Sequence, residues 1–445
     1  MISLKPYPQY KDSDVAWLGL IPENWTITRN KSYLKYRKDT VGDDSENYTL
    51  LSLTLKGIIK RDMDNPQGKF PAEFNTYKIV NQGDLIFCLF DIDETPRTVG
   101  LSSYDGMITG AYDILYSDNQ KVIDYLYLYY LAIDNIKGLR PLYSGLRKVV
   151  PKDVFMSMKI ALPSENEQVL IVRYLNYTNS RITRFVVAKK KLIKLLEEQK
   201  QAIIYQAVIG AIDVRTGKPY LKYKDTGDEL VRVPWGWNSS KIKYVCSIHN
   251  GSDHKSIETD AGYPVIGSGG QFSYASRFIY DKESVLFGRK GTIDKPLYME
   301  QPFWTVDTMF YTKIYKKIFP KYLYYIAKTI PYQFYSTHTA LPSMTQTILG
   351  NFRIGLPSIE SQKSIVDFIG QELFVIDQTI DHAKKEIDLL KEYRTRLTAD
   401  VVTGKVDVRE VAKNLPDELK TITELDEEEF GDTADGQLEQ ENEEI

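Results

Sequence analysis

Two long stretches of the chain decide its fold, because they repeat one pattern. Residues 162–210 read LPSENEQVLIVRYLNYTNSRITRFVVAKKKLIKLLEEQKQAIIYQAVIG, and residues 356–404 read LPSIESQKSIVDFIGQELFVIDQTIDHAKKEIDLLKEYRTRLTADVVTG. The offset between them holds at 194 residues from the opening Leu-Pro-Ser to the closing glycine. A constant offset means that neither stretch has an insertion or deletion relative to the other, as expected for one continuous element such as a long helix. We predict two long helices, with Ser164 and Ser358 as N-caps and with Gly210 and Gly404 just past the ends.

The apolar residues of both stretches recur at alternating spacings of four and three, which is the heptad pattern of a coiled coil. Each helix is too apolar on one face to stand in water, so we expect the two to pair with each other in an antiparallel arrangement. A helix from about Ser164 to Val208 spans roughly 65 Å at ~1.5 Å per residue, enough to act as a ruler. The predicted seam consists of Leu175, Ile182, Val186, Ile193, Leu196, Ile203, Ile369, Ile376, Ile380, Ile387, Leu390 and Leu397.

The regions before each helix also match, but their offset drifts from 213 to 200 residues and little identity remains between the motifs. Such drift is typical of two globules that are free to differ. Short β-type runs broken by Gly, Asn and Asp turns, followed by helix-like stretches at 122–133 and 321–327, indicate mixed α/β globules. The recurring motifs are Tyr10-Lys11-Asp12-Ser13 with Tyr223-Lys224-Asp225-Thr226, Ile21-Pro22-Glu23-Asn24-Trp25 with Val233-Pro234-Trp235-Gly236-Trp237, and Tyr129-Tyr130-Leu131-Ala132 with Tyr324-Tyr325-Ile326-Ala327.

This repeat predicts a mixed α/β molecule with a pseudo-twofold internal symmetry, in which two long helices separate two globules. We divide the chain into a first globule, a first helix, a second globule, a second helix and a tail. The corresponding residues are 1–160, 161–213, 214–355, 356–410 and 411–445. The tail carries 13 Asp and Glu against two Lys, so we expect it to be disordered.

Composition narrows the class of protein. Residues 1–410 carry a net charge of +8, which suits binding to a polyanion although many cytoplasmic proteins reach this value. The two cysteines, Cys88 and Cys246, lie far apart without metal-ligand spacing, which indicates a reducing compartment, no disulfide and no metal site. The N-terminus lacks a signal-peptide pattern, and the longest apolar stretch, 125–133, is far shorter than the roughly 20 residues of a membrane helix. We predict a soluble, cytoplasmic protein.

The order of these motifs resembles the specificity subunits of Type I restriction–modification systems. The resemblance is carried by the opening motif, by Trp17-Leu18-Gly19 and Ile21-Pro22-Glu23-Asn24-Trp25, and by Leu-Pro-Ser with Gln and Ile-Val before each helix. It covers nearly the whole chain, from Tyr10 to about Val408. The second-half motif, Val233 to Trp237, is a looser version of the first, and the acidic tail is not part of the family core.

The resemblance implies two target-recognition domains, each of which reads one half of a bipartite, asymmetric site on double-stranded DNA. It also implies that the antiparallel coiled coil sets the half-site separation and docks two methyltransferase subunits. Restriction subunits can join this complex. S-adenosylmethionine, and ATP with Mg²⁺ where restriction subunits are present, would bind to those partners, so we expect no cofactor on this chain.

In the second globule, glycine-flanked polar turns are the candidates for DNA contact, because glycine lets the backbone approach a phosphate closely. Gly288-Arg289-Lys290-Gly291-Thr292 presents two cations and resembles a Gly-Arg-x-Gly turn of the family. Each candidate has a plainer interpretation as a hairpin turn or a solvated loop. The candidates in this half are Ser268, Gln271, Arg277, Arg289, Lys290, Thr337 and His338.

In the first globule the corresponding turn, Phe90 to Arg97, is longer and acidic. Its carboxylates could accept hydrogen bonds from cytosine amino groups, although a solvated loop is the plainer interpretation. Basic residues beside Gly57 and Gly145 are further candidates, against the alternative that most surface cations are only solvated. The candidates in this half are Lys56, Lys60, Arg61, Arg97, Arg140, Arg147 and Lys148.

Enzymatic functions find no support in the sequence. An amino-methyltransferase needs an Asn/Asp-Pro-Pro-aromatic motif, which is missing, and no Ser/His/Asp spacing indicates a hydrolase. His249, Asp253 and His254 could imitate a metal site, but a coincidence within one loop is the simpler interpretation. We therefore predict a non-catalytic DNA-reading subunit. The alternative is a coiled-coil adaptor that binds proteins without sequence-specific DNA binding.

Overall fold

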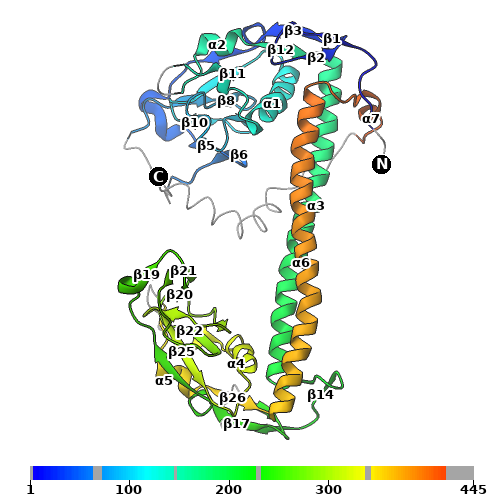
Figure 1. Ribbon diagram of the computed structural model, residues 1–445. Coiled ribbons are helices and arrows are strands. Elements are labelled where there is room, and N and C mark those ends of the chain that lie inside the picture. The colour runs from blue at the N-terminus through cyan, green and yellow to red at the C-terminus, as the bar shows by residue number, and fades with distance from the viewer. Residues whose placement is uncertain (1–3, 64–72, 145–147, 227–231, 336–341, 417–445) are drawn as a thin grey trace. The chain divides into compact units, whose positions relative to one another are not determined.

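The computed structural model describes residues 4–63, 73–144, 148–226, 232–335 and 342–416 (Figure 1). The chain forms two compact units. Unit 1 comprises residues 1–191 and 384–445, and unit 2 comprises residues 192–383. Each unit therefore combines one globule with parts of both long helices, whereas the division expected from the sequence separates globules from helices. That finer division stays a prediction.

Two long helices are present where the sequence predicts them. Helix α3 covers Glu165–Val208 and helix α6 covers Ile359–Val402, each with 44 residues. The Ser358 hydroxyl accepts a hydrogen bond from the Ser361 N–H at 3.2 Å, so it caps α6. Gly210 and Gly404 follow the two helices with φ of +74° and +75°, a backbone conformation that glycine adopts without strain.

Within each unit the two long helices run antiparallel. In unit 1, Lys189 Nζ of α3 lies 2.6 Å from Glu386 Oε2 of α6, and the start of α3 shares a core with the end of α6. In unit 2, Lys200 Nζ lies 2.6 Å from Asp377 Oδ1, and the end of α3 shares a core with the start of α6. The predicted seam residues are all buried or half-buried. Regular coiled-coil geometry and the pseudo-twofold relation stay predictions.

Unit 1 is built on a four-stranded antiparallel sheet in the order β4-β11-β8-β9. Helix α1 (Gln120–Asn135) packs on this sheet, with the rings of Phe87 and Tyr130 5.1 Å apart, and the short helix α2 (Lys152–Ser157) follows later. The strands of the sheet are β4 (Lys35–Arg37), β8 (Leu85–Phe87), β9 (Val99–Leu101) and β11 (Asp113–Tyr116). The other pairs are β1 (Tyr10–Asp12) with β2 (Leu20–Pro22), β3 (Thr26–Arg29) with β12 (Lys159–Leu162), β5 (Leu51–Thr54) with β6 (Gly57–Lys60), and β7 (Lys78–Val80) with β10 (Gly106–Ile108).

Unit 2 repeats this plan. Its first sheet has the order β18-β25-β22-β23, and helices α4 (Pro320–Ala327) and α5 (Gln346–Asn351) take the places of α1 and α2 in the chain. The strands of this sheet are β18 (Cys246–Asn250), β22 (Ser284–Gly288), β23 (Leu297–Met299) and β25 (Met309–Ile314). A second sheet contains β19 (Glu258–Thr259), β21 (Gly270–Ala275), β20 (Tyr263–Gly267) and β24 (Trp304–Thr305). The remaining pairs are β13 (Ile212–Asp213) with β14 (Lys218–Pro219), β15 (Tyr223–Asp225) with β16 (Arg232–Pro234), and β17 (Asn238–Lys241) with β26 (Arg353–Leu356).

The duplicated motifs have a structural role at the helix ends. In unit 1 the Tyr10 hydroxyl donates to the Gly404 carbonyl at 3.1 Å, and a Cβ on Gly404 would lie 2.5 Å from Pro22. In unit 2 the Tyr223 hydroxyl donates to the Gly210 carbonyl at 2.9 Å, and a Cβ on Gly210 would lie 2.5 Å from Pro234. Each motif therefore packs on the end of a long helix, where only glycine leaves room.

The first residues of the predicted tail are ordered. Helix α7 (Arg409–Lys413) extends beyond residue 410, and Ala412 is fully buried in the core of unit 1. These residues are ordered because Val411, Ala412 and Leu415, which precede the acidic residues, are apolar and pack on that core. Residues 417–445, which hold the acidic part, lie outside the described residues. Among the residues that the structure places, no helix has the length and apolar character to cross a membrane.

Candidate nucleic-acid interface

In unit 2, two of the predicted loops meet at one end of the sheet β18-β25-β22-β23. Thr308, just before β25, is the common partner: its hydroxyl accepts from the Ser268 N–H at 3.3 Å, and its carbonyl accepts from the Arg289 N–H at 2.8 Å. The turn after β22 and the loop between β20 and β21 are therefore adjacent. A Cβ on Gly291 would lie only 3.2 Å from the Ser268 hydroxyl, and Gly291 has a φ of +79°.

The side chain of Arg289 is positioned by its surroundings. One guanidinium nitrogen donates to the Asp307 carbonyl at 3.2 Å, and the guanidinium carbon lies 5.9 Å from the centre of the Phe310 ring. Lys290 beside it is exposed. The turn is fixed on its other side by the Met344 N–H, which donates to the Arg289 carbonyl at 2.9 Å. The two cations thus project from a fixed backbone, as a recognition surface requires.

Close backbone packing leaves no room for side chains at this sheet end. A Cβ on Gly251 would lie 2.1 Å from the Val306 carbonyl oxygen, and a Cβ on Gly288 would lie 2.4 Å from the Thr292 carbonyl oxygen. Asn250 ends β18 beside this contact, and the Gln346 amide donates to its side-chain oxygen at 3.1 Å. The sequence-based prediction missed both amides.

Two further predicted residues of unit 2 lie on or just after strand β21 of its second sheet. Gln271 is exposed on β21, and Arg277 follows this strand, with its guanidinium carbon 5.9 Å from the centre of the Trp304 ring. Strand β21 also exposes Phe272 and Tyr274, aromatic residues of the kind that stack on bases. Two other predicted residues, Thr337 and His338, lie outside the described residues.

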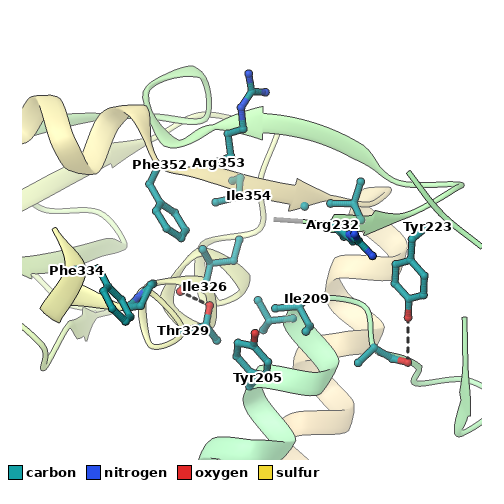
Figure 2. A pocket seen from close by; sticks show the side chains of 15 residues that line it. Tyr205, Ile209, Tyr223, Arg232, Ile326, Thr329, Phe334, Phe352, Arg353 and Ile354 are labelled. Atoms are coloured by element: carbon teal, nitrogen blue, oxygen red, sulfur yellow. Dashed lines mark hydrogen bonds between the residues drawn. The ribbon is translucent and has the colours of Figure 1, made fainter. Parts of the chain in front are cut away.

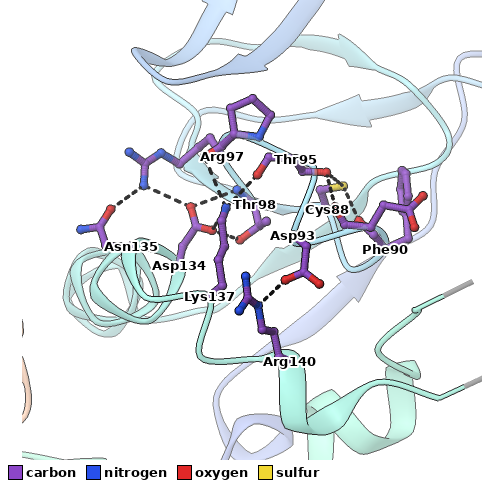
Figure 3. A network of polar contacts seen from close by, with 12 residues as sticks. Cys88, Phe90, Asp93, Thr95, Arg97, Thr98, Asp134, Asn135, Lys137 and Arg140 are labelled. Carbon is purple, nitrogen blue, oxygen red and sulfur yellow. Dashed lines mark hydrogen bonds and ion pairs between the residues drawn. The ribbon is translucent and has the colours of Figure 1, made fainter. Parts of the chain in front are cut away.

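The corresponding turn of unit 1 is closed by ion pairs (Figure 3). The Asp93 carboxylate pairs with the Arg140 guanidinium, and Lys148 Nζ lies 3.8 Å from both Asp93 and Glu94. The backbone connection resembles that of unit 2, because the Val150 N–H donates to the Leu89 carbonyl at 2.8 Å. Arg140 and Lys148 are thus near each other, as predicted, but both face carboxylates. Arg147 lies outside the described residues.

Arg97, another predicted DNA contact, is already engaged within the fold. It donates to Asp134 at 3.1 Å and to Asn135 at 3.0 Å, and its side chain is only 17% exposed (Figure 3). Asp134 also accepts from the Thr98 hydroxyl at 2.6 Å and from Lys137 at 3.0 Å. Arg97 therefore fastens the acidic turn to α1, and any DNA contact by it stays a prediction.

The basic hairpin of unit 1 lies apart from this turn. Lys56 sits between β5 and β6, and Lys60 ends β6 with Nζ 4.6 Å from the centre of the Tyr104 ring. The Arg61 N–H donates to the Leu50 carbonyl at 2.8 Å. The site residues of unit 1 thus lie on two segments, Lys56, Lys60 and Arg61 on or beside the β5–β6 hairpin and Arg140 and Lys148 beside the acidic turn.

The end of the unit 1 sheet carries lysines that the sequence-based prediction missed. Buried Asp113 lies 2.6 Å from Lys152 Nζ and 3.6 Å from Lys78 Nζ. Burial is the main cause that lowers the pKa of Lys78 below its usual value. The 194-residue offset between the two halves aligns Lys152 with Gln346. This alignment is the feature of the sequence that could have identified Lys152 as a site residue.

Each unit also has an apolar groove near the end of a long helix. The groove of unit 2 has a volume of about 580 Å³ and is lined by residues such as Tyr205, Ile209, Ile326, Phe334, Phe352 and Ile354 (Figure 2). The groove of unit 1 has a volume of about 380 Å³ and uses matching elements, the end of α6 with α1 and β12. The described residues lining the first groove include no carboxylate, histidine or cysteine.

In the part of the chain that the structure describes, the two cysteines are buried and the histidines are not grouped into a metal site. Burial raises the pKa of Cys246 to about 12 and that of Cys88 above its usual value. His249 Nε2 lies 2.9 Å from the Ser247 hydroxyl, and burial lowers its pKa. Over the described ranges, no three His, Cys, Asp or Glu side chains are grouped to hold a metal ion.

Known proteins are similar to this chain in sequence. Residues 234–392 match the Type I restriction modification DNA specificity domain. The Type I restriction enzyme MjaVIII specificity subunit of Methanocaldococcus jannaschii is 23% identical over 433 residues, which cover 87% of this chain and 94% of that protein.

One solved structure shows agreement in fold, and a second is similar at a lower score. A chain from a structure on complex assembly and conformational transition of the type I R-M system has a TM-score of 0.64 at 14% identity, covering 86% of this chain and 98% of that one. The HsdS subunit from Thermoanaerobacter tengcongensis has a TM-score of 0.47 at 15% identity, covering 86% and 96%. In sequence the chain is thus similar to specificity subunits of Type I restriction–modification systems.

Proposed function

We propose that this chain reads a bipartite DNA site, one half with each unit, and directs partner methyltransferase subunits to it. The strongest support for this proposal is that the two units share one strand topology but present different polar surfaces. The strand orders β4-β11-β8-β9 and β18-β25-β22-β23 match, yet the sheet end carries Lys152, Asp113 and an acidic turn in unit 1 and Asn250, Gln346, Arg289 and Lys290 in unit 2. A shared scaffold with divergent polar ends suits two readers of different sequences.

The cations provide the affinity in this proposal. Lysine and arginine side chains that contact phosphates release counterions, so the DNA affinity falls steeply as salt rises. Arg289 and Lys290 in unit 2, and Lys60, Arg140 and Lys148 in unit 1, are the described cations that we assign to DNA. Base-edge contacts then supply the sequence preference.

The long helices supply the surface for partner subunits. Each unit leaves large apolar side chains of α3 and α6 exposed, which is unusual for a surface that stays in water. These side chains are Phe185, Leu389 and Tyr393 in unit 1 and Leu195, Phe374 and Val375 in unit 2. We assign them to two methyltransferase subunits, which would hold S-adenosylmethionine and perform the chemistry, while this chain is non-catalytic. The same surface also fits the alternative, a protein-binding adaptor.

DNA binding separates the two functions. The full chain, in complex with its methyltransferase subunits, is titrated with labelled duplexes of known target sequence and scrambled sequence at several salt concentrations. The proposal predicts tighter binding to the target and a steep loss of affinity with salt, with a slope of about −0.9 per phosphate contact. Equal, salt-independent binding of both duplexes would establish the adaptor.

A further inference from the structure

A pair of side-chain amides lies at the sheet end of unit 2, and neither has yet been given a base to read. Asn250 is the last residue of β18 and is exposed, and Gln346 is the first residue of α5 and is half-exposed. The Gln346 amide nitrogen donates to the Asn250 side-chain oxygen at 3.1 Å. The two residues are 96 positions apart in the chain, so the fold brings them together.

The backbone holds both amides in place. Asn250 pairs with Phe310 in the β18–β25 ladder, and the next residue, Gly251, donates its N–H to the Met309 carbonyl at 3.2 Å. Gln346 follows Thr345, whose hydroxyl accepts from the Ile348 N–H at 3.2 Å and so fixes the start of α5. Little side-chain freedom is therefore left to lose when a ligand binds.

The amides belong to the same surface as the two cations. Met344, two residues before Gln346, donates its N–H to the Arg289 carbonyl at 2.9 Å. In the strand ladders, Phe310 pairs with both Asn250 and Phe287, and Arg289 follows Phe287 by two residues. Amides and cations thus meet at one end of one sheet.

Their chemistry matches one kind of base edge. The mutual hydrogen bond leaves the Gln346 side-chain oxygen as an acceptor and the Asn250 NH₂ group as a donor. In the major groove, adenine presents an N7 acceptor next to an N6 donor, which an amide donor–acceptor pair satisfies. A lysine has donors only, so it fits the two acceptors of guanine instead.

We propose that Asn250 and Gln346 read one A·T base pair in the half-site of unit 2. This inference rests on the proposed function and assigns it a base and two residues. The matching position of unit 1 is Lys152, whose Nζ lies 2.6 Å from Asp113. The same structural position thus carries an amide pair in one unit and a lysine in the other, and the two half-sites differ accordingly at the base it reads.

The test uses the full chain produced together with its methyltransferase subunits in cells, with methylated adenines mapped across the genome. Asn250→Ala and Gln346→Ala each make one A·T position of one half-site degenerate, with discrimination falling about tenfold. The other half-site and the gap stay unchanged. The control is Asn351→Ala, at the far end of α5, where the amide oxygen accepts from Lys243 at 2.9 Å; this variant keeps the wild-type motif.

A variant that gains a new base preference excludes misfolding as the cause of a changed motif. Gln346→Lys places the unit 1 side chain in unit 2, and we expect the same position to shift from A·T toward G·C. A new preference cannot result from unfolding. An unchanged motif in all three variants, or uniformly weaker methylation at an unchanged motif, overturns the base-reading role. If the wild-type chain itself yields no bipartite motif, the proposed function fails first.

Discussion

The sheet ends of the two units have the same strand order but are held together in different ways. In unit 1, side-chain ion pairs fasten the turn after β8: Asp93 with Arg140 and Lys148, and Asp134 with Arg97. In unit 2, the turn after β22 is fastened through the backbone, because Gly288 allows close approach and the Arg289 N–H donates to Thr308 at 2.8 Å.

This difference has a consequence for recognition. A turn closed by ion pairs uses its charged side chains within the fold, while a turn closed by backbone contacts leaves its side chains available to a ligand. The charged residues of this turn in unit 1 are thus paired within the fold, whereas in unit 2 Lys290 is exposed and Arg289 is half-buried with one hydrogen bond to the Asp307 carbonyl. The two units share a scaffold and differ in what that scaffold presents.

The largest expected effect is on the stability of unit 1. Asp134→Ala removes the carboxylate that accepts from Arg97, Thr98 and Lys137, and it leaves two mostly buried cations unpaired. We expect a loss of about 3–5 kcal/mol in the free energy of unfolding. Urea denaturation measures this, and hydrogen exchange should show the loss in peptides of unit 1 only. Unchanged stability would mean that ion pairs do not hold this turn.

A somewhat smaller effect is expected at the matched position Cys88 and Gly288. Gly288→Cys places a Cβ 2.4 Å from the Thr292 carbonyl oxygen, so unit 2 should lose about 3 kcal/mol. Cys88→Ala only removes a buried sulfur in unit 1 and should cost about 1 kcal/mol. Urea denaturation of the full-length variants compares the two. Equal losses would contradict the view that the turn after β22 depends on close backbone packing and the turn after β8 does not.

The third prediction concerns DNA affinity through unit 2. Arg289→Ala removes a positioned cation and should weaken binding of the target duplex by about 10- to 100-fold. Lys243→Ala, whose side chain contacts Asn351 instead, serves as the charge-matched control with little effect. Fluorescence anisotropy at two salt concentrations measures both variants. If the two lose affinity equally, net charge rather than position determines binding.

The smallest effect is expected from the acidic turn of unit 1. Asp93→Asn releases Arg140 and Lys148 from an exposed ion pair worth about 0.2–1 kcal/mol, so DNA binding should tighten a few-fold and depend more steeply on salt. The same anisotropy titration measures this change. Weaker binding instead would show that the Asp93 carboxylate contacts DNA directly, as an acceptor from cytosine.

The fold was more predictable from the sequence than the site. Heptad spacing and glycine stops placed the first helix from about Ser164 to Val208, and it runs from Glu165 to Val208. The helix-like stretch at 122–133 lies within α1. Periodicity is a local property, so a single sequence displays it.

The site depends on pairs that are remote in sequence. Arg97 looked available for DNA, but Asp134 lies 37 positions away and holds it. Neither Asn250 nor Gln346 is marked as a site residue by its own sequence context. The two come together only in the folded unit 2, where Asn250 lies in the β18–β25 ladder and Gln346 begins α5. Side-chain partners of this kind follow from packing, which no local pattern encodes.

The central claim is that each unit reads its own half of one DNA site. Genome-wide adenine-methylation mapping tests it most directly, in cells that express the methyltransferase subunits with and without this chain. If each unit reads its own half-site, we expect a motif that appears only with the chain and consists of two short half-sites separated by a gap of fixed length. A single continuous motif, or no new methylation despite a stable complex with the methyltransferase, would contradict it.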